Sequence, residues 1–319
     1  MPSDNSTIIH VQDLIKHYKK ADKSAVDGVS FDVAAGSFFA LLGPNGAGKT
    51  TTISVLTTTL SKTSGEVTID GYDVETQATE VRSRIGIIFQ NPSLDLNLTA
   101  EENVRLHAIL YGVASYRPTY SLMPDSYKKK VDELADILDI TKDLHKPIKT
   151  FSGGMKRKLE IIRSLIHNPS VLFWMNPPRD STPRAEGICG LTCKISRKKH
   201  NMTIFLTTHY LEEAEGADQV CVMNHGKIVA HGSPAQLKSS MIKNYVSIKA
   251  KDMEGLTREL AKKKISFTNR EKSIDIACTD SKIHGLLKSI DTPITSVQIH
   301  TPSLEEAYLE IIGEKIQTT

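Results

Sequence analysis

The segment Gly43-Pro-Asn-Gly-Ala-Gly48-Lys49-Thr50 fits the phosphate-binding pattern G-x-x-x-x-G-K-[ST]. Glycines let backbone N–H groups turn toward phosphate oxygens, and the N-terminus of a following helix adds partial positive charge. In this chemistry Lys49 reaches the β- and γ-phosphates, and the Thr50 hydroxyl ligates Mg²⁺. The loop lies between an apolar strand and a helix, which argues against a chance glycine-rich turn. We therefore expect ATP and Mg²⁺ as cofactors. The expected nucleotide-binding residues in this loop are Gly43, Pro44, Asn45, Gly46, Ala47, Gly48, Lys49, Thr50 and Thr51.

A second loop, Phe151-Ser-Gly-Gly-Met-Lys-Arg157, has the composition of another anion-binding turn. Its Ser152, Gly153 and Gly154 precede a helix and offer a hydroxyl and backbone N–H groups. The loop resembles the signature loop of ATP-binding cassette proteins, in which glutamine is usual at the position of Met155. In that family the signature loop binds the γ-phosphate of an ATP held by the other subunit. The resemblance therefore implies a homodimer in the ATP-bound state.

Three more positions match the same family in order and spacing. Gln90 looks like the glutamine that contacts Mg²⁺ and senses the transport channel. His209 looks like the switch histidine that contacts the γ-phosphate, and Tyr18 lies where the family stacks a ring on adenine. An ordinary strand-edge tyrosine is the alternative for Tyr18. The tail from Thr301 to Glu310 is similar to the extra C-terminal domain of the daunorubicin and drug-export branch.

The sequence departs from the family after the strand that begins at Val171. The family expects Asp-Glu-Pro there, and this chain has Met175 at the metal-binding aspartate and Asn176 at the catalytic glutamate. A thioether is a poor Mg²⁺ ligand, and an amide cannot act as a general base. Taken literally, the chain binds nucleotide and hydrolyses it very slowly. A nucleotide-binding regulator without turnover is therefore an alternative function.

A shift of the reading frame by one base offers another interpretation of this departure. Codons for the residues around Trp174, read one base earlier, can spell Leu-Asp-Glu-Pro, in which Asp and Glu are forced. Those from Pro178 to Pro183 can spell Thr-Thr-Gly-Leu-Asp-Pro. We hypothesise that residues 174 to about 199 are translated out of frame between two compensating single-base changes. Ordinary divergence at these positions is the alternative.

The chain alternates short apolar strands with helical patterns, which predicts an α/β core with a parallel sheet. Together with the resemblance, residues 1–240 are expected to form a P-loop NTPase cassette with a mixed sheet and a helical signature subdomain. Residues 241–319 read β-α-β-β-α-β, followed by a last helix. That order predicts a small α+β, ferredoxin-like accessory domain.

Composition limits the classes of partner. Lys and Arg number 40 and Asp and Glu 37, and a net charge of +3 is too small to indicate nucleic acid. No window approaches the roughly 18 apolar residues of a membrane-spanning helix, and the N-terminus lacks a secretory segment. The four cysteines are read as reduced thiols. A cassette protein acting on ribosomes or DNA is disfavoured, because such proteins typically carry two cassettes or a long coiled-coil insertion.

The remaining expectation concerns a membrane partner. The resemblance implies an exporter subunit docked on a separate permease at the cytoplasmic face of the membrane. The segment from Asp95 to Glu102 is where the family contacts its permease. The same segment also reads as an ordinary capped helix start, with Thr99 as N-cap and Glu102 three residues later. The transported substrate is set by the permease, and drug, lipid or other amphiphile export all fit.

Overall fold

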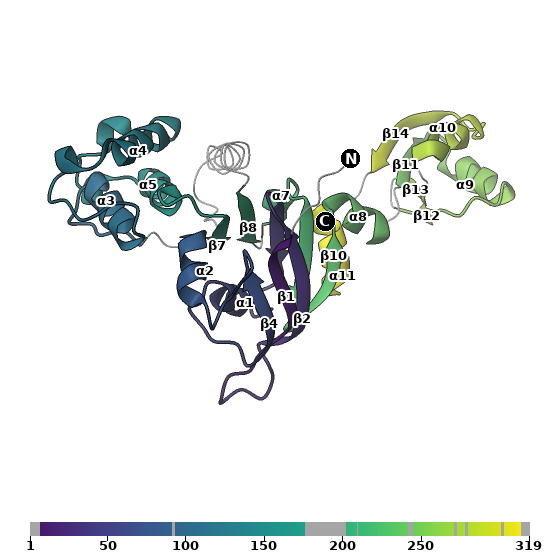
Figure 1. Cartoon of the computed structure of the whole chain (residues 1–319). Coiled ribbons are helices and arrows are strands. Elements are labelled where there is room, and N and C mark those ends of the chain that lie inside the picture. Colours follow the sequence, from purple (N-terminus) through teal and green to yellow (C-terminus); the bar gives the residue numbers. More distant parts are fainter. Residues whose placement is uncertain are drawn as a thin grey trace, which may run out of the picture. The chain divides into compact units, whose positions relative to one another are not determined.

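The computed structural model describes residues 7–90, 93–175, 202–208, 210–241, 245–270, 273–277, 280–300 and 303–313 (Figure 1). The chain divides into two compact units, Met1–His231 and Gly232–Thr319. Helix α8 (Pro234–Met241) contacts α11 (Leu304–Ile312), so it groups with the second unit. The boundary we expected, between residues 240 and 241, instead falls within this helix.

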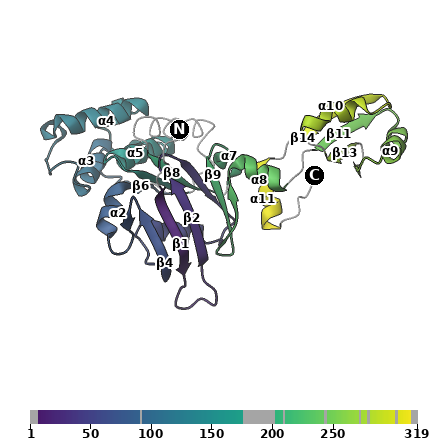
Figure 2. The ribbon, with the colours of Figure 1, turned by 45° about the vertical axis from the view of Figure 1, so that its right-hand side comes forward.

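The first unit contains an antiparallel sheet that lies beside the P-loop region. Its strands are β1 (Thr7–Lys16), β2 (Val26–Ala34), β4 (Ser64–Ile69) and β5 (Tyr72–Asp73), in the order β2-β1-β4-β5. Figure 2 shows β1, β2 and β4 side by side. Along β2, buried residues alternate with less buried ones, as expected for a sheet with one face on the core.

The second sheet of this unit supplies the edge at which the candidate site is assembled. Its order is β10 (Lys227–Gly232), β9 (Gln219–Asn224), β3 (Phe38–Leu42), β8 (Thr203–Thr208), β7 (Val171–Met175) and β6 (Ile85–Ile88). Strands β3, β8, β7 and β6 run parallel to one another. All six residues of β8 are buried, its three threonines included, as expected for a parallel strand covered on both faces.

Four phenylalanine side chains join the two sheets in one core. The Phe31 and Phe39 rings stack with centroids 5.3 Å apart, and Phe39 lies 4.9 Å from Phe205. Phe173 of β7 lies 5.3 Å from the same Phe205 ring. Aromatic pairs at these separations add packing energy beyond simple area burial. The core therefore fixes β7 against β8 and β3, the strands that precede the candidate site.

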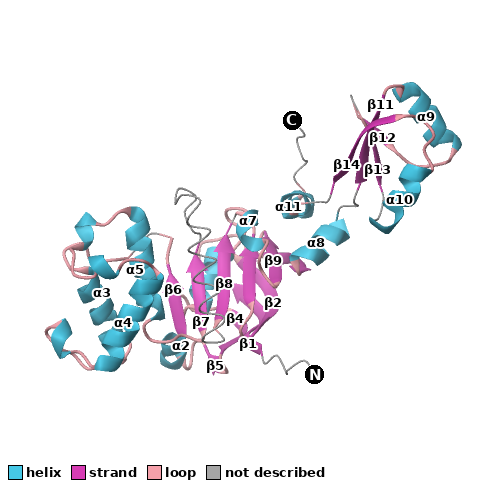
Figure 3. Ribbon diagram, turned by 90° about the horizontal axis from the view of Figure 1, so that it is seen from above, coloured by secondary structure: helices cyan, strands magenta, loops and turns pink. Residues whose placement is uncertain are grey.

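Helices complete the first unit. Helices α1 (Lys49–Leu56), α2 (Ala78–Arg84) and α7 (Leu211–Ala214) accompany the sheets, and α3 (Ala100–Leu110), α4 (Asp125–Ile137) and α5 (Gly153–Leu165) form a helical subdomain. Short 3₁₀ turns η1 (Tyr120–Leu122), η2 (Thr141–Asp143) and η3 (Ile148–Thr150) connect them. Figure 3 shows α3, α4 and α5 gathered on the β6 side of the parallel sheet, and α5 contacts β6.

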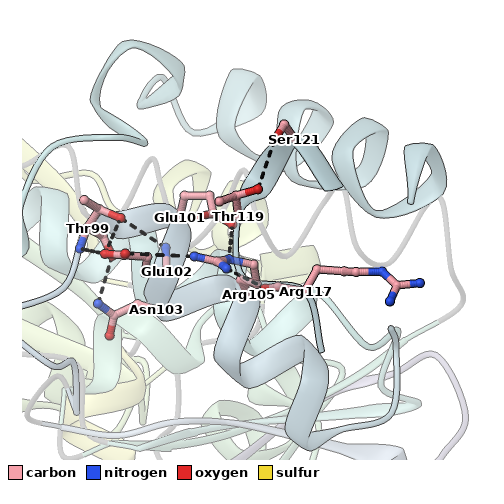
Figure 4. A network of polar contacts seen from close by, with 8 residues as sticks. All are labelled: Thr99, Glu101, Glu102, Asn103, Arg105, Arg117, Thr119 and Ser121. Atoms are coloured by element: carbon pink, nitrogen blue, oxygen red, sulfur yellow. Dashed lines mark hydrogen bonds and ion pairs between the residues drawn. The ribbon is translucent and has the colours of Figure 1, made fainter. Parts of the chain in front are cut away.

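A capping box begins α3, as the sequence predicted. The Thr99 hydroxyl accepts from the Glu102 N–H at 3.2 Å, and the Glu102 carboxylate accepts from the Thr99 N–H at 2.8 Å (Figure 4). Two N–H groups at the start of the helix, which have no carbonyl partner within it, are hydrogen-bonded in this way. The buried Arg105 side chain pairs with Glu101 at 2.8 Å and donates to the Arg117 carbonyl at 2.7 Å. These contacts hold the start of α3 in a fixed position.

The second unit contains a four-stranded antiparallel sheet in the order β12 (Thr268–Asn269), β13 (Ile274–Ala277), β11 (Tyr245–Ala250) and β14 (Ile294–His300). Helices α9 (Met253–Lys262) and α10 (Asp280–Lys288) supply Leu256, Leu260 and Ile283 to a hydrophobic cluster with its strands. Along the chain the order is β-α-β-β-α-β, that of the split βαβ pattern. Across the described ranges, no helix has the length and apolar character to span a membrane.

Candidate functional site

The loop from Gly43 to Gly48 connects the end of β3 to the start of α1. Gly48 is the N-cap of α1 with φ of 105°, and a Cβ there would lie 2.4 Å from the Ala25 carbonyl oxygen. Only glycine fits this position. Gly46 also has positive φ, but a Cβ there would have no heavy atom within 4 Å. The loop therefore packs closely against the protein at Gly48 and is open at Gly46.

Lys49 is the first residue of α1 and its side chain turns back under the loop. The residue is only 6% exposed, and its Nζ donates to the Gly43 carbonyl at 2.5 Å and the Pro44 carbonyl at 3.0 Å. Burial lowers the pKa of this ammonium, and no described carboxylate contributes to that pKa. A buried cation without a counter-ion is unfavourable. The residues present therefore fit an anion such as the phosphates of ATP.

Hydroxyl groups line the first turn of α1. Thr50 is exposed, and the Thr51 hydroxyl lies 3.5 Å from the Tyr18 hydroxyl. The Tyr18 residue is 43% exposed, and Lys16 Nζ lies 5.6 Å from the centre of its ring. The structure thus brings Tyr18, from the end of β1, next to the P-loop. Its remaining exposed ring surface is available to a flat ligand.

The parallel strands end at one edge of the sheet, which is where open α/β sheets bind ligands. The P-loop follows β3 at this edge, and the exposed Gln90 follows β6. Met175 ends β7 in register with Thr207 of β8. The two remaining residues of the expected catalytic set, Asn176 and His209, lie outside the described residues.

Met175 occupies the position at which the family resemblance leads us to expect a metal-binding aspartate. Its side chain is half-buried and packs against the core cluster that contains Phe173 and Phe205. Within the described segments, no group of three or more histidine, cysteine or acidic side chains could hold a metal ion. The Mg²⁺ ligands that we expected and that can be located are Thr50 and Gln90. Both would contribute neutral oxygens.

The signature loop lies at the start of α5. The Ser152 hydroxyl accepts from the Met155 N–H at 3.3 Å and caps the helix. Gly153 and Gly154 are exposed, and a Cβ at either would have no heavy atom within 4 Å. Met155 is partly buried and packs against the core of the helical subdomain. The loop therefore presents an open, glycine-lined helix N-terminus.

Two arginines of α5, to which the sequence analysis gave no role, hold the segment that contains Gln90. Arg157 Nη1 donates to the Phe89 carbonyl. Arg163 donates to the Ser93 carbonyl through Nη1 and to the Ser93 hydroxyl through Nη2 at 3.0 Å. Arg157 is the last residue of the quoted signature motif, but its spacing within that motif gives no indication of a partner near residue 90.

Comparison with known proteins identifies the family of this chain. A family model described as ABC transporter matches residues 26–177. The daunorubicin/doxorubicin resistance ATP-binding protein DrrA of Streptomyces peucetius is 31% identical over 98% of this chain and 94% of its own length. The chain belongs to the ABC transporter ATP-binding protein family. Its P-loop, signature loop and parallel-sheet edge are thus parts of an ATP-binding cassette.

Further similarities concern the branch and the fold of this ABC protein. The daunorubicin resistance ATP-binding protein DrrA3 of Streptomyces coeruleorubidus is 30% identical over 97% of this chain and 96% of its own length. The solved structure of cbiO1 from Clostridium perfringens, part of the ABC transporter complex cbiONQ, superposes with a TM-score of 0.64 at 26% identity. That match covers 73% of this chain and 91% of the solved one. The expected ABC family, drug-exporter-like branch and P-loop cassette fold are confirmed.

Proposed function

We propose that this chain binds ATP and Mg²⁺ at the P-loop and couples ATP binding, and hydrolysis where it occurs, to transport by a separate membrane permease. The observation that carries the proposal is Lys49, a buried ammonium without a carboxylate partner among the described residues, beneath an open glycine loop. Bound Mg²⁺ would supply positive charge to the phosphates. Thr50 and Gln90 are the described side chains proposed to hold it, and Tyr18 is proposed to stack on adenine.

The exposed signature loop supports a second part of the proposal, a homodimer in the ATP-bound state. Gly153 and Gly154 lie open at the start of α5, and Ser152 precedes them. We assign these residues to the γ-phosphate of an ATP held by a second copy of the chain. Gly154→Asp should place a carboxylate against that phosphate and prevent ATP-induced dimerisation, measured by light scattering after size-exclusion chromatography. Lys142→Asp, an exposed change elsewhere in the cassette, should leave dimerisation intact.

An apolar surface supports the permease as partner. Leu110 of α3 is 83% exposed and Leu106, one turn earlier, is 44% exposed. Val113 and Tyr116 continue the exposed apolar side chains after the helix. Exposed apolar groups that lie close together typically mark an interaction site. We propose that this surface, made of the exposed side chains of Leu106, Leu110, Val113 and Tyr116, contacts the permease together with the expected segment Asp95–Glu102. These contacts would keep the chain peripheral on the cytoplasmic face of the membrane.

Hydrolysis by the chain as written is proposed to be strongly impaired. Met175 has a thioether where a carboxylate is expected, and its half-buried side chain packs against the core cluster. The amide of the residue at position 176 cannot serve as a general base.

Buried polar atoms without hydrogen-bond partners near the end of β7 support the frame-shift hypothesis. Trp174 Nε1, Arg157 Nη2 and Glu160 Oε1 are buried without a hydrogen-bond partner. Buried polar atoms of this kind are uncommon in native proteins, and leucine at position 174 would remove one of them.

The decisive experiment compares the chain as written with a version in which the shifted-frame residues are restored, including Met175→Asp and Asn176→Glu. Binding of Mg-ATP is followed by calorimetry and phosphate release by a colorimetric assay. We expect both proteins to bind ATP and only the restored one to turn over, with a gain of about 10²- to 10⁴-fold from the general base. Equal turnover would show that the catalytic carboxylate comes from elsewhere. Failure of both proteins to bind ATP would refute the nucleotide site itself.

The chain as written also fits the second candidate function, a nucleotide-binding regulator without turnover. The observation that favours it is Met175, whose side chain is packed rather than free to ligate. Resequencing the gene separates the two. Confirmation of the printed reading frame supports a regulator or a genuine lesion, and a corrected frame supports the hydrolysing exporter subunit.

A further inference from the structure

The second unit carries a small polar cavity on the sheet face opposite its helices. Ile274 and Ile276 of β13 pack with Leu256 and Leu260 of α9. Side chains alternate along a strand, so Asp275 lies on the other face. A cavity of about 340 Å³ opens there, which is within the size range of small-molecule sites. Its lining residues are Tyr245, Ser247, Arg270, Asp275, Gln298 and Ile299.

Strand register places three of these residues in one row. Ser247 of β11 lies opposite Asp275 of β13 on one side and opposite Gln298 of β14 on the other. Directly opposed residues of antiparallel strands have Cβ atoms about 4.5–5.5 Å apart. The row therefore offers a carboxylate, a hydroxyl and an amide within the span of one small ligand.

Asp275 is the unusual member of this row. The residue is only 8% exposed, and its Oδ2 accepts from Arg270 Nε at 2.5 Å. Its Oδ1 is buried and has no hydrogen-bond partner. A buried acceptor left without a donor costs about 1–3 kcal/mol. Because Asp275 lines the cavity, a rotation of its carboxylate would present this acceptor to a donor supplied by a ligand.

The adjoining Arg270 restricts the class of ligand. Its side chain is 48% exposed, and its guanidinium lies 6.0 Å from the centre of the Tyr245 ring. A purely cationic ligand would approach this guanidinium against repulsion, and a purely anionic ligand would meet the same problem at Asp275. A small molecule with an ammonium group beside a carboxylate matches both charges. Tyr245 and Ile299 add apolar surface for the rest of such a molecule.

We propose that this cavity binds a small zwitterion of the α-amino-acid class, with its ammonium on Asp275 Oδ1 and its carboxylate on the Arg270 guanidinium. The site is made only of residues from the second unit. It is independent of the nucleotide site, so the two proposals succeed or fail separately.

The test is calorimetric titration of the full chain, without nucleotide, using each free L-amino acid in turn. We expect at least one to bind with a dissociation constant between about 1 μM and 1 mM. Its N-acetyl derivative, which lacks the ammonium, should bind at least about tenfold more weakly, as should its C-terminal amide, which lacks the carboxylate.

Matched variants assign the binding to the cavity. Asp275→Asn and Arg270→Gln should each weaken binding at least about tenfold, because each removes one charge-assisted hydrogen bond. Glu254→Gln, an acid-to-amide change at an exposed pair on α9, should leave it unchanged. Should Asp275→Asn fail to fold by circular dichroism, Gln298→Leu on the exposed rim provides the second test. Absence of binding by every amino acid, or binding that survives the cavity variants, overturns the proposal.

Discussion

The guanidinium carbon of Arg157 lies 5.2 Å from the centre of the Trp174 ring. Arg157 belongs to the signature helix α5, and Trp174 is the second-last residue of β7. The same guanidinium donates to Glu160 at 2.7 Å and to the Phe89 carbonyl, directly before Gln90. One side chain thus joins the signature helix, the strand that leads to residue 176 and the residue before Gln90, the glutamine expected to contact Mg²⁺.

Replacing Arg157 should destabilise the cassette, because its ion-pair partner Glu160 would remain buried without a counter-ion. Glu160 is fully buried, so Arg157→Leu leaves an unpaired carboxylate in the core. We expect a loss of about 3–5 kcal/mol in the free energy of unfolding, measured by urea titration. The double variant Arg157→Leu, Glu160→Leu should recover most of that loss. Lys128→Leu breaks an exposed pair and should change stability by less than about 1 kcal/mol. A double variant as unstable as the single one would contradict this explanation.

Replacing Lys49 should remove nucleotide affinity without unfolding the protein. Lys49→Met keeps the length and apolar stem of the side chain but deletes the buried ammonium that faces no described carboxylate. Loss of a charged hydrogen bond of about 1.5–3 kcal/mol predicts Mg-ATP binding weaker by about 10- to 150-fold. Calorimetry measures the affinity, and Lys142→Met on the exposed turn η2 is the charge-matched control. Unchanged affinity in Lys49→Met would place the phosphates elsewhere.

Two histidines of the helical subdomain should make stability depend on pH. Burial lowers the pKa of His107 to about 3, with Arg163 adding to the effect, and burial lowers that of His167 to about 4. When the pH falls below 6.5, the ordinary pKa of histidine, these two side chains take up protons in the unfolded chain but stay neutral in the folded chain. Above pH 6.5 neither histidine lowers the free energy of unfolding. As pH falls toward 4, each histidine removes about 1.4 kcal/mol per pH unit.

Urea unfolding at about pH 7.5 and about pH 5 measures this loss. His107→Phe should make the free energy of unfolding less dependent on pH, because one of the two buried titrating groups is gone. His10 acts in the opposite sense, since its hydrogen bond to Asp32 raises its pKa. The comparison of each variant with the parent chain cancels that contribution. An identical pH dependence in His107→Phe would show that His107 does not contribute.

A charge on the apolar surface of α3 should separate nucleotide binding from membrane recruitment. Leu110→Glu changes a side chain in a residue that is 83% exposed, so folding and Mg-ATP binding should be preserved. Co-purification with the permease from membranes should fall at least about tenfold, because a charge must be desolvated at an apolar contact. Val229→Glu on β10, 45% exposed, is the control and should retain association. Retained association in Leu110→Glu would exclude this surface.

Some of this architecture could be predicted because it depends on neighbouring residues. Gly48 has a positive φ at the start of α1, which favours glycine locally, and Thr99 and Glu102 cap α3 within a single helical turn. The alternation of strands with helices likewise predicted the parallel sheet. The domain boundary was harder to place, because α8 groups with the second unit through a contact with α11, which lies far from it along the chain. The roles of all the individual site residues remain predictions, and Asn176 and His209 also lie outside the described residues.

The sequence by itself determined the P-loop, the signature loop and the family, since each depends on residue types at fixed short spacings. It also shows Met175 and Asn176 at the two positions where the resemblance leads us to expect aspartate and glutamate. Only the tertiary structure decided that Lys49 is buried without a described counter-ion and that Asp275 has an unpaired oxygen in a cavity. It alone brought Arg157 to the Phe89 carbonyl, 68 residues away along the chain. Such contacts join residues that are far apart in the sequence, so they form only when the chain folds and brings those segments together. The spacing of neighbouring residues does not reveal them.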